Sequence, residues 1–360
     1  RQTGALNTNT RYIYRNILDY AERLTSGMPD NLSVCVFVNS GSEANDIALR
    51  MARFATGQHG ALVMHNAYHG ITESTIDLSP YEVKEEDLAP HVRTLMSPDP
   101  YRGIYKQGES DLAGKYAADT DRAIEDLAKN GFKLAAGMID TAYISNGIPD
   151  VPEGYLVAVT QKIQVAGGLL IADEVQAGFG RPGTHMWGFM AQGVVPDFVT
   201  MGKPVGNGYP LGVIVTSPDN LNAFVKETDL FSTFGGNPVA CAAGMAVLDV
   251  IENEALMANA RTTGEYLRQG IRSLMTKYDI IGDVRGKGML AGIELIRDHK
   301  TLEPADTETE RMLDLLRDNN VFVGSEGPFY NILKIRPPMI FKPEHADVLI
   351  QALDRSFKVL

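Results

Sequence analysis

Two spacings of apolar residues alternate along the chain and predict strands and helices in turn. Short apolar runs that close on glycine or a polar residue predict buried strands within 32–38, 60–70, 134–140, 169–173 and 198–201. Apolar residues three and four positions apart predict helices at 14–24, 39–57, 119–131 and 154–166. This alternation implies an α/β fold with a mainly parallel sheet covered by helices.

The last third of the chain has a different pattern. Residues 237–275 predict long helices, and residues 282–296 with the hairpin-like tail suggest a smaller α+β domain. Residues 76–130 are rich in Asp, Glu, Pro and Tyr, so we expect a less regular segment with a loop before the helix at 119–131. We therefore predict a large domain over residues 1–255 and a small carboxyl-terminal domain over residues 256–360.

Composition limits the class of protein. A chain of 360 residues with 44% hydrophobic residues can bury one large core and a smaller one. Its net charge of −12, with no window rich in Lys and Arg, argues against a nucleic-acid partner. No apolar stretch reaches the roughly 20 residues that span a bilayer, and the start lacks the apolar region of a signal peptide. Cys35 and Cys241 are too few for a disulfide framework or a metal site, so we expect a cytoplasmic protein with reduced thiols.

A lysine and an aspartate stand at the ends of two apolar runs. Asp173 closes LLIAD, and thirty residues later Lys203 follows FVTM and a glycine. Parallel strands deliver such residues to one edge of a sheet, so we expect the two side chains to meet. Lysine forms Schiff bases with aldehyde cofactors, and a carboxylate against a pyridine nitrogen keeps that ring protonated. The pair predicts a pyridoxal phosphate site, although Asp173 alone could be a turn residue and Lys203 alone a surface charge.

A cofactor phosphate would need amides and hydroxyls, ideally at the start of a helix. Ser40, Gly41 and Ser42 begin the expected helix at 39–57 and are placed for this, unless Ser42 is an ordinary helix cap. Tyr68, in AYHG, could stack on the pyridine face or pack in the core. Thr233, in FSTFGGNP, could supply a further hydroxyl or belong to its Gly-Gly turn.

Five separated motifs carry a family resemblance: NSGSEAND, AYHG, LIADEVQAGFGRPG, TMGKPVGNGYPLG and FSTFGGNP, in this order and spacing. From about residue 6 to its end, the chain closely resembles the class III aminotransferase group of fold-type-I pyridoxal phosphate enzymes. The resemblance implies a seven-stranded, mainly parallel sheet with helices on both faces, and a small carboxyl-terminal domain. It also implies a homodimer with shared active sites. Family members carry an amino-terminal stretch that we expect to be missing here, because the sequence starts with Arg1.

The resemblance also implies a role for each residue of the site. Lys203 would carry the cofactor as the internal aldimine, and Asp173 would pair with its pyridine nitrogen. Tyr68 would stack on the ring, and Gln176 would contact the phenolic oxygen. The residues implied to hold the cofactor phosphate are Gly41, Ser42 and, from the neighbouring subunit, Thr233.

Departures from the family pattern narrow the expected reaction. Class III aminotransferases tend to carry an Arg before a Pro-Pro pair near the carboxyl terminus, and here Lys334 of NILKIRPPM takes that place. Lysine suits a phosphate better than it replaces a bidentate carboxylate clamp. Asn207, in the lysine loop, stands where aminotransferases commonly have Gly. These features, with IIGDVRGKGM, resemble the phospho-lyase branch, which acts on O-phosphoethanolamine or 5-phosphohydroxylysine. Asp140 and Thr141 replace the usual Glu-Pro, in a stretch that fits neither branch well.

Three functions compete on this sequence. The first is a phospho-lyase that converts O-phosphoethanolamine to acetaldehyde, ammonia and phosphate. Its substrate would be held by Arg11, Asn207 and Lys334, with Arg336 as a further cation, unless ion pairs use these charges. The second is an ω- or β-amino-acid aminotransferase that moves an amine to a keto acid. The third is a cofactor-binding protein without catalysis, against which the intact lysine and aspartate argue.

Overall fold

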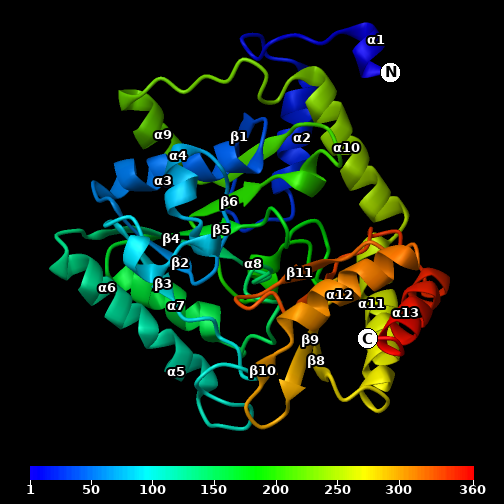
Figure 1. Cartoon of the computed structure of the whole chain (residues 1–360). Helices are drawn as coiled ribbons and strands as arrows, with labels where there is room; N and C mark the ends of the chain where they lie inside the picture. Colours follow the sequence, from blue (N-terminus) through cyan, green and yellow to red (C-terminus); the bar gives the residue numbers. More distant parts are fainter.

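The computed structural model describes residues 1–360, apart from the side chains of residues 82 and 85. Figure 1 shows a large sheet between layers of helices, with a smaller group of strands and helices beside it. The large sheet has seven strands in the order β1-β7-β6-β5-β4-β2-β3. Their bounds are Val34–Val38, Gly212–Thr216, Phe198–Met201, Leu169–Asp173, Leu134–Asp140, Gly60–Met64 and Val92–Leu95. The predicted α/β fold with a seven-stranded, mainly parallel sheet is confirmed.

Strand β7 runs antiparallel to both of its neighbours, β1 and β6. The pairs β3–β2, β2–β4, β4–β5 and β5–β6 are all parallel. The central strands are short and apolar because both of their faces are covered. In Figure 1, α3 (Gly41–Thr56) lies on one side of the strands, and α6 (Asp119–Lys129) and α7 (Tyr155–Val165) lie on the other. The remaining helices of this part are α1 (Gln2–Ala5), α2 (Arg15–Thr25), α4 (Glu73–Asp77), α5 (Leu112–Ala117), α8 (Gly188–Ala191), α9 (Pro218–Glu227) and α10 (Pro238–Asn253).

The smaller part has its own five-stranded sheet and its own apolar core. Its strands are β8 (Ile281–Arg285), β9 (Ala291–Asp298), β10 (Glu303–Pro304), β11 (Gly324–Glu326) and β12 (Ile332–Ile335). All pairs in this sheet are antiparallel. Helices α11 (Leu256–Met275), α12 (Asp306–Asp318) and α13 (Pro343–Phe357) complete it. The chain passes from α10 to α11 through residues 254–255, but the domain boundary at residue 255 stays a prediction.

Two strands of the large sheet are missing from the sequence-based expectations. β3 lies inside the segment expected to be irregular, and its sequence VRTL lacks a continuous apolar run because it occupies a sheet edge. β7 follows directly on the glycine-rich lysine loop, whose turn residues obscure where the strand begins. The hairpin-like tail is a true antiparallel pair, β11 with β12, but it is followed by the long helix α13.

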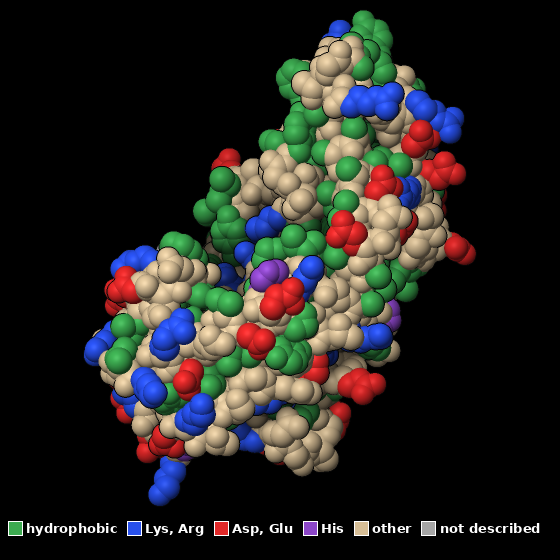
Figure 2. Space-filling view, turned by 90° about the vertical axis from the view of Figure 1, so that its right-hand side faces the viewer, with side chains coloured by type: hydrophobic (Ala, Val, Ile, Leu, Met, Phe, Trp, Pro, Cys, Tyr) green, Lys and Arg blue, Asp and Glu red, His purple; other side chains and the backbone are tan. Residues whose placement is uncertain are grey.

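The surface in Figure 2 belongs to the side that carries α10 and α13. Basic and acidic side chains are intermingled there, and hydrophobic side chains gather at the top, where the amino-terminal segment projects. In that segment Tyr12 and Ile13 are 62% and 81% exposed. Among the described residues, no helix combines the length and the apolar character that crossing a membrane requires.

Candidate active site

The carboxyl ends of three neighbouring strands meet at one cavity of about 180 Å³. Asp140 ends β4, Asp173 ends β5 and Lys203 follows β6 by two residues. Because parallel strands end at the same edge of a sheet, their last residues converge, as the sequence predicted for Asp173 and Lys203. The other residues that line the cavity are Gly41, Ser42, Asn45, Tyr68, His69, Gly70, Val175 and Gln176.

Asp173 is a buried carboxylate that the protein holds ionised. His69 Nδ1 lies 2.7 Å from its Oδ2, which also accepts a 2.9 Å hydrogen bond from Asn45 Nδ2. Its Oδ1 accepts from the amide of Val175 at 3.0 Å. Burial would raise the pKa of Asp173, but the hydrogen bonds and the neighbouring imidazole outweigh burial and leave that pKa below its usual value. The ionised Asp173 therefore contributes a negative charge to the wall of the cavity.

Two further acids flank Asp173: the half-buried Asp140 and the fully buried Glu174. Burial and the neighbouring Asp173 raise the pKa of Asp140 to about 6, against two hydrogen bonds from the amides of Ala142 and Ile144. Burial also raises the pKa of Glu174 to about 7. Glu174 accepts hydrogen bonds from the amides at residues 188 and 189 and from the hydroxyl at residue 141, so it ties α8 to the strand end. Glu174 therefore organises the fold behind the cavity.

Lys203 extends from a strained backbone into the cavity. Its φ of +37° lies in the left-handed region, which residues other than glycine adopt rarely. Among the residues that the structure describes, no group hydrogen-bonds its Nζ. Burial of the amine within the site lowers the pKa of Lys203, the cations of Arg336 and Lys334 lower it further, and Asp173 and Asp140 oppose them. A free amine with a lowered pKa is suited to nucleophilic attack and to proton transfer.

The amino terminus of α3 forms one wall. Ser40 caps this helix: its Oγ accepts from the Glu43 amide at 3.1 Å, and the Glu43 carboxylate accepts in return from the Ser40 amide. The alternative that Ser42 is the cap is therefore wrong, and Ser42 Oγ instead accepts from the amide of Ile71 at 3.2 Å. The first amides of a helix have no acceptor within it, so those of Gly41 and Ser42 remain available to an anion.

Glycine is required where this wall approaches the lysine loop. A Cβ added at Gly202 would lie 3.0 Å from both the nitrogen and the Cα of Gly41. A Cβ at Gly41 would meet Val175 Cγ2 at 3.0 Å. The two backbones therefore touch directly, and the phosphate wall and the lysine are fixed relative to each other.

These residues fit pyridoxal phosphate on several independent points. The helix start suits a phosphate, the ionised Asp173 suits a protonated pyridine nitrogen, and the free Lys203 amine suits an aldehyde. Tyr68 lines the cavity and is 43% exposed, which leaves its ring available for stacking rather than packed in the core. His69 and Asn45, which fix Asp173, were not singled out from the sequence, although both lie inside the motifs AYHG and NSGSEAND.

The cations near Lys203 differ in their partners. Lys334 is paired with Glu326, whose other oxygen accepts from the Tyr81 hydroxyl at 3.2 Å. Arg336 instead donates to the neutral side-chain oxygen of Gln176. Among the side chains that the structure describes, no carboxylate pairs with Arg336. The structure therefore uses Lys334 as an ion-pair partner and leaves Arg336 with an uncompensated charge.

Arg181, which lies near Arg336, holds the loop after β5 in place. It donates to the carbonyl oxygens of Met289 and Pro337 at 3.2 and 3.0 Å. Burial and the nearby Arg336 lower the pKa of Arg181 to about 10. Two guanidinium groups thus lie near each other, one of them bonded to Gln176 of the cavity wall, without an acidic partner among the described side chains.

Five residues that the sequence suggested for substrate or cofactor do not line this cavity: Lys334 and Arg336, described above, and Asn207, Arg11 and Thr233. Asn207 is exposed with a left-handed φ of +42°, a conformation that Asn and Gly tolerate. Arg11 is exposed, with its guanidinium 5.8 Å from the centre of the Phe231 ring. Thr233 is also exposed, and its carbonyl accepts from the Thr10 amide at 3.1 Å. Their contacts with substrate or cofactor stay predictions.

Comparison with known proteins gives the family. The model of the aminotransferase class-III family matches residues 3–357. Alanine–glyoxylate aminotransferase 2 homolog 2, mitochondrial, of Arabidopsis thaliana is 41% identical over 349 residues, which are 96% of this chain and 71% of that protein. Ethanolamine-phosphate phospho-lyase homolog 1 of Caenorhabditis elegans is 36% identical over 375 residues, which cover 100% of this chain and 80% of the relative.

Solved structures agree in fold. A phospholyase from Arthrobacter in complex with phosphoethanolamine is 40% identical, with a TM-score of 0.94 over 100% of this chain and 85% of the other. An amine transaminase from an uncultivated Pseudomonas species, in its PLP-bound form, is 28% identical, with a TM-score of 0.90 over 99% of this chain and 85% of the other. The predicted cofactor is thereby confirmed as pyridoxal 5′-phosphate. The chain belongs to the class III aminotransferase family, as a fold-type-I enzyme that depends on this cofactor.

Proposed function

We propose that this enzyme is a phospho-lyase acting on O-phosphoethanolamine. One molecule of substrate and one of water would give acetaldehyde, ammonia and inorganic phosphate. The carbon–oxygen bond to the phosphate breaks, phosphate leaves with the electron pair, and water later hydrolyses the released enamine to the aldehyde. No oxidant or second substrate is needed, so the reaction balances without a keto acid.

The observation that carries this proposal is the uncompensated charge of Arg336 beside Lys203. The start of α3 already accounts for the phosphate of the cofactor. Lys334 is neutralised by Glu326, whereas the described side chains give Arg336 one polar partner, the neutral Gln176. A cation without a counter-charge near a reactive lysine points to an anionic group on the substrate, and a guanidinium binds phosphate oxygens in a bidentate way.

The residues of the site divide this work in a simple way. Pyridoxal phosphate, when bound, draws electrons from the carbon that carries the substrate amine. Lys203 Nζ can take the proton from that carbon, and its lowered pKa favours the unprotonated amine that this step requires. Asp173, fixed by His69, holds the negative charge that a protonated pyridine nitrogen requires. Arg336 would stabilise the charge that develops on the departing phosphate.

Two relatives support the phosphorylated substrate. The Arthrobacter phospholyase was solved with phosphoethanolamine, and the Caenorhabditis elegans relative is a homolog of ethanolamine-phosphate phospho-lyase. Together they match the whole length of this chain at 40% and 36% identity. We carry their substrate class to this chain as part of the proposal, with 5-phosphohydroxylysine as the larger substrate to be tested beside phosphoethanolamine.

The second candidate is an amine transfer to a keto acid. It is favoured by the Arabidopsis thaliana relative, an alanine–glyoxylate aminotransferase homolog, which is 41% identical. A free guanidinium such as Arg336 can also bind a substrate carboxylate. That reaction has no phosphate leaving group. It requires a keto acid as amine acceptor in the second half of each catalytic cycle.

A phosphate-release assay separates the two candidates. The enzyme, loaded with cofactor, is incubated with O-phosphoethanolamine or 5-phosphohydroxylysine and no keto acid, and inorganic phosphate and aldehyde are measured together. We expect equal amounts of both over many turnovers. Alanine with glyoxylate serves as the matched aminotransferase assay. Turnover only in the second assay, without phosphate release in the first, would overturn the lyase and support the aminotransferase.

We also propose that a second copy of the chain completes the site. Tyr68 of the cavity wall is 43% exposed, Ile71, which follows Gly70 of that wall, is 74% exposed, and Phe231, two residues before Thr233, is 58% exposed. Such apolar exposure around a reaction site favours a partner that excludes water. Thr233 does not line the cavity of its own chain, which supports its predicted role toward the neighbouring subunit. Analytical ultracentrifugation should show a dimer, and Thr233→Val should lower its affinity for the cofactor. A fully active monomer would contradict the proposal.

A further inference from the structure

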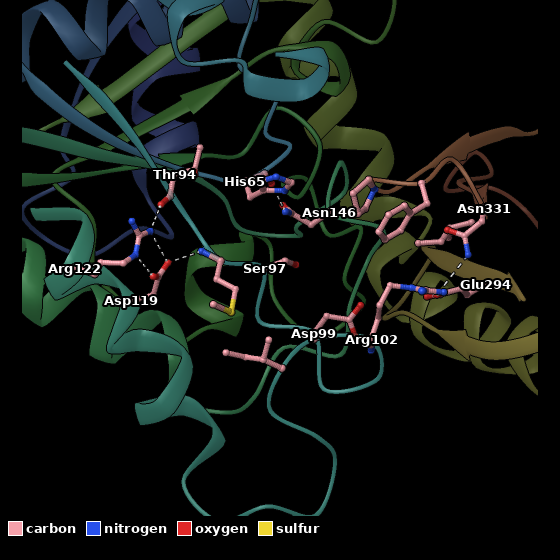
Figure 3. Close-up of a pocket in the computed structure, with 16 residues that line it drawn as sticks. His65, Thr94, Ser97, Asp99, Arg102, Asp119, Arg122, Asn146, Glu294 and Asn331 are labelled. Atoms are coloured by element: carbon pink, nitrogen blue, oxygen red, sulfur yellow. Dashed lines mark hydrogen bonds and ion pairs between the residues drawn. The ribbon is translucent and has the colours of Figure 1, made fainter. Parts of the chain in front are cut away.

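A second cavity, of about 480 Å³, lies between the large sheet and the smaller domain. Figure 3 shows Ser97 in its middle, with Asp119 and Arg122 on one side and Arg102, Glu294 and Asn331 on the other. It shares no lining residue with the cavity of Lys203. Ser97 follows β3 of the large sheet, whereas Asn331 immediately precedes β12 of the small sheet. The cavity is therefore a separate feature built by both domains.

The charged side chains around this cavity are paired within the protein. Arg102 Nε donates to Glu294 Oε1 at 2.6 Å, and Arg122 Nε donates to Asp119 Oδ1 at 2.6 Å. Asp99, the fifth charged residue of the wall, lies 3.8 Å from a guanidinium nitrogen of a buried arginine, residue 285. A charged ligand would have to compete with these existing pairs, so the walls favour an uncharged one.

Two oxygen atoms in the wall lack a partner in the protein. Asn331 is fully buried, and its Nδ2 donates to the carbonyl of Leu295 at 2.8 Å, while its Oδ1 accepts no hydrogen bond from another residue. Ser97 Oγ is buried as well and has no partner. A buried acceptor left unpaired destabilises the folded state, and a group that donates to it regains that loss. Neither atom exposes surface to the cavity in this conformation, so each side chain must turn to reach a ligand, and both then call for one with N–H or O–H groups.

The rest of the wall is apolar and comes from both domains. Met96 and Ile104 belong to the segment after β3, and Phe329 and Ile332 belong to the segment around β12. Ile332 is buried, whereas Ile104 and Phe329 are 63% and 47% exposed and stand at the mouth. An apolar lining with a few converging polar atoms is typical of a small-molecule site.

We propose that this cavity is a second ligand site, which takes an uncharged organic molecule with an apolar body and an N–H or O–H donor. The donor binds Asn331 Oδ1, and Ser97 Oγ binds a neighbouring polar atom of the ligand. Because the ligand touches both domains, its binding stabilises their relative position and can couple to events at the Lys203 cavity. The site is independent of which reaction the enzyme catalyses.

Benzamide is a suitable probe, because it joins an apolar ring to an uncharged primary amide, and benzoate presents the same ring with a negative charge. We expect calorimetric titration of the cofactor-loaded enzyme to give one benzamide per chain, with benzoate at least tenfold weaker. Ser97→Ala should weaken benzamide about fivefold, the effect of one neutral hydrogen bond. Ile104→Trp should narrow the mouth and weaken it at least tenfold, whereas Val165→Trp, at a 91% exposed position outside the cavity, should have no effect.

A crystal structure of the enzyme with benzamide locates the probe, with the amide expected on Asn331 Oδ1. The proposal is overturned by any of several results: no saturable binding in solution, equal affinity for benzoate, or ordered water alone at Asn331 and Ser97 in the crystal. Binding that neither Ser97→Ala nor Ile104→Trp weakens would place the probe elsewhere and would also overturn it. Since Ile104 is exposed, its substitution leaves the folded core intact.

Discussion

Replacing Arg336 by glutamine removes a cation near Lys203 that pairs with no carboxylate among the described side chains. Within the described residues the hydrogen-bond partner of Arg336 is the neutral Gln176, so the substitution breaks no ion pair there and leaves no carboxylate uncompensated. Arg336 is also exposed, and the variant should fold normally. The loss is therefore expected in the interaction with substrate phosphate. A hydrogen bond to a charged group contributes about 1.5–3 kcal/mol, which corresponds to a decrease in kcat/KM of roughly 10- to 150-fold.

The measurement is the initial rate of phosphate release from O-phosphoethanolamine over a range of concentrations. Arg336→Lys should recover part of the lost rate, because it restores the charge without the planar fork. Arg317→Gln, an exposed substitution on α12, is the matched control and should leave the rate unchanged. If kcat/KM falls less than about threefold in Arg336→Gln, a change under 1 kcal/mol, Arg336 does not bind the leaving group. The argument from its uncompensated charge is then refuted.

Other predictions follow from the same cavity. Lys203→Ala should abolish turnover and the absorbance of the lysine-bound cofactor, and an active variant would contradict the assignment of the site. Gly202→Ala places a Cβ 3.0 Å from the Gly41 backbone and should lower the affinity for the cofactor at least tenfold, as measured by titration of cofactor fluorescence. Gly27→Ala is the control, because a Cβ there has nothing within 4 Å, and it should leave the affinity unchanged. The value of kcat should rise with pH as Lys203 loses its proton. Because Arg336 lowers the pKa of Lys203, Arg336→Gln should raise that pKa and move the rising limb of the kcat–pH profile to higher pH. An unmoved limb, or one moved to lower pH, would show that the two groups do not interact.

The sequence predicts the cofactor site well because its residues stand at positions that geometry brings together. Asp173 closes a buried strand and Lys203 follows the next, and parallel neighbours end at a common edge. The helix start at Gly41 and Ser42 follows from a strand, a capping serine and an amphipathic run. Each of these inferences needs only local pattern and the direction of strands.

The surroundings of the substrate could not be predicted in the same way. Arg336 meets Gln176 across 160 positions of sequence, and no local pattern indicates that contact. Glu326 reaches Lys334 through the register of a short antiparallel pair, which apolar spacing leaves undefined. The sequence therefore identifies the cations near the Pro-Pro pair but not which of them is already neutralised. That distinction decides which charge is available to a substrate.

The left-handed backbone at Lys203 has a consequence for engineering. A lysine introduced at the end of a strand in another parallel sheet would share its side-chain chemistry but not its direction of approach. Reproducing the latter requires the φ of +37°, the glycine before it and the 3₁₀ turn Lys203–Val205 that follows. A design that transfers this site therefore needs the short backbone segment around the lysine together with the helix start that faces it. A lysine grafted alone should bind an aldehyde but catalyse its reaction poorly.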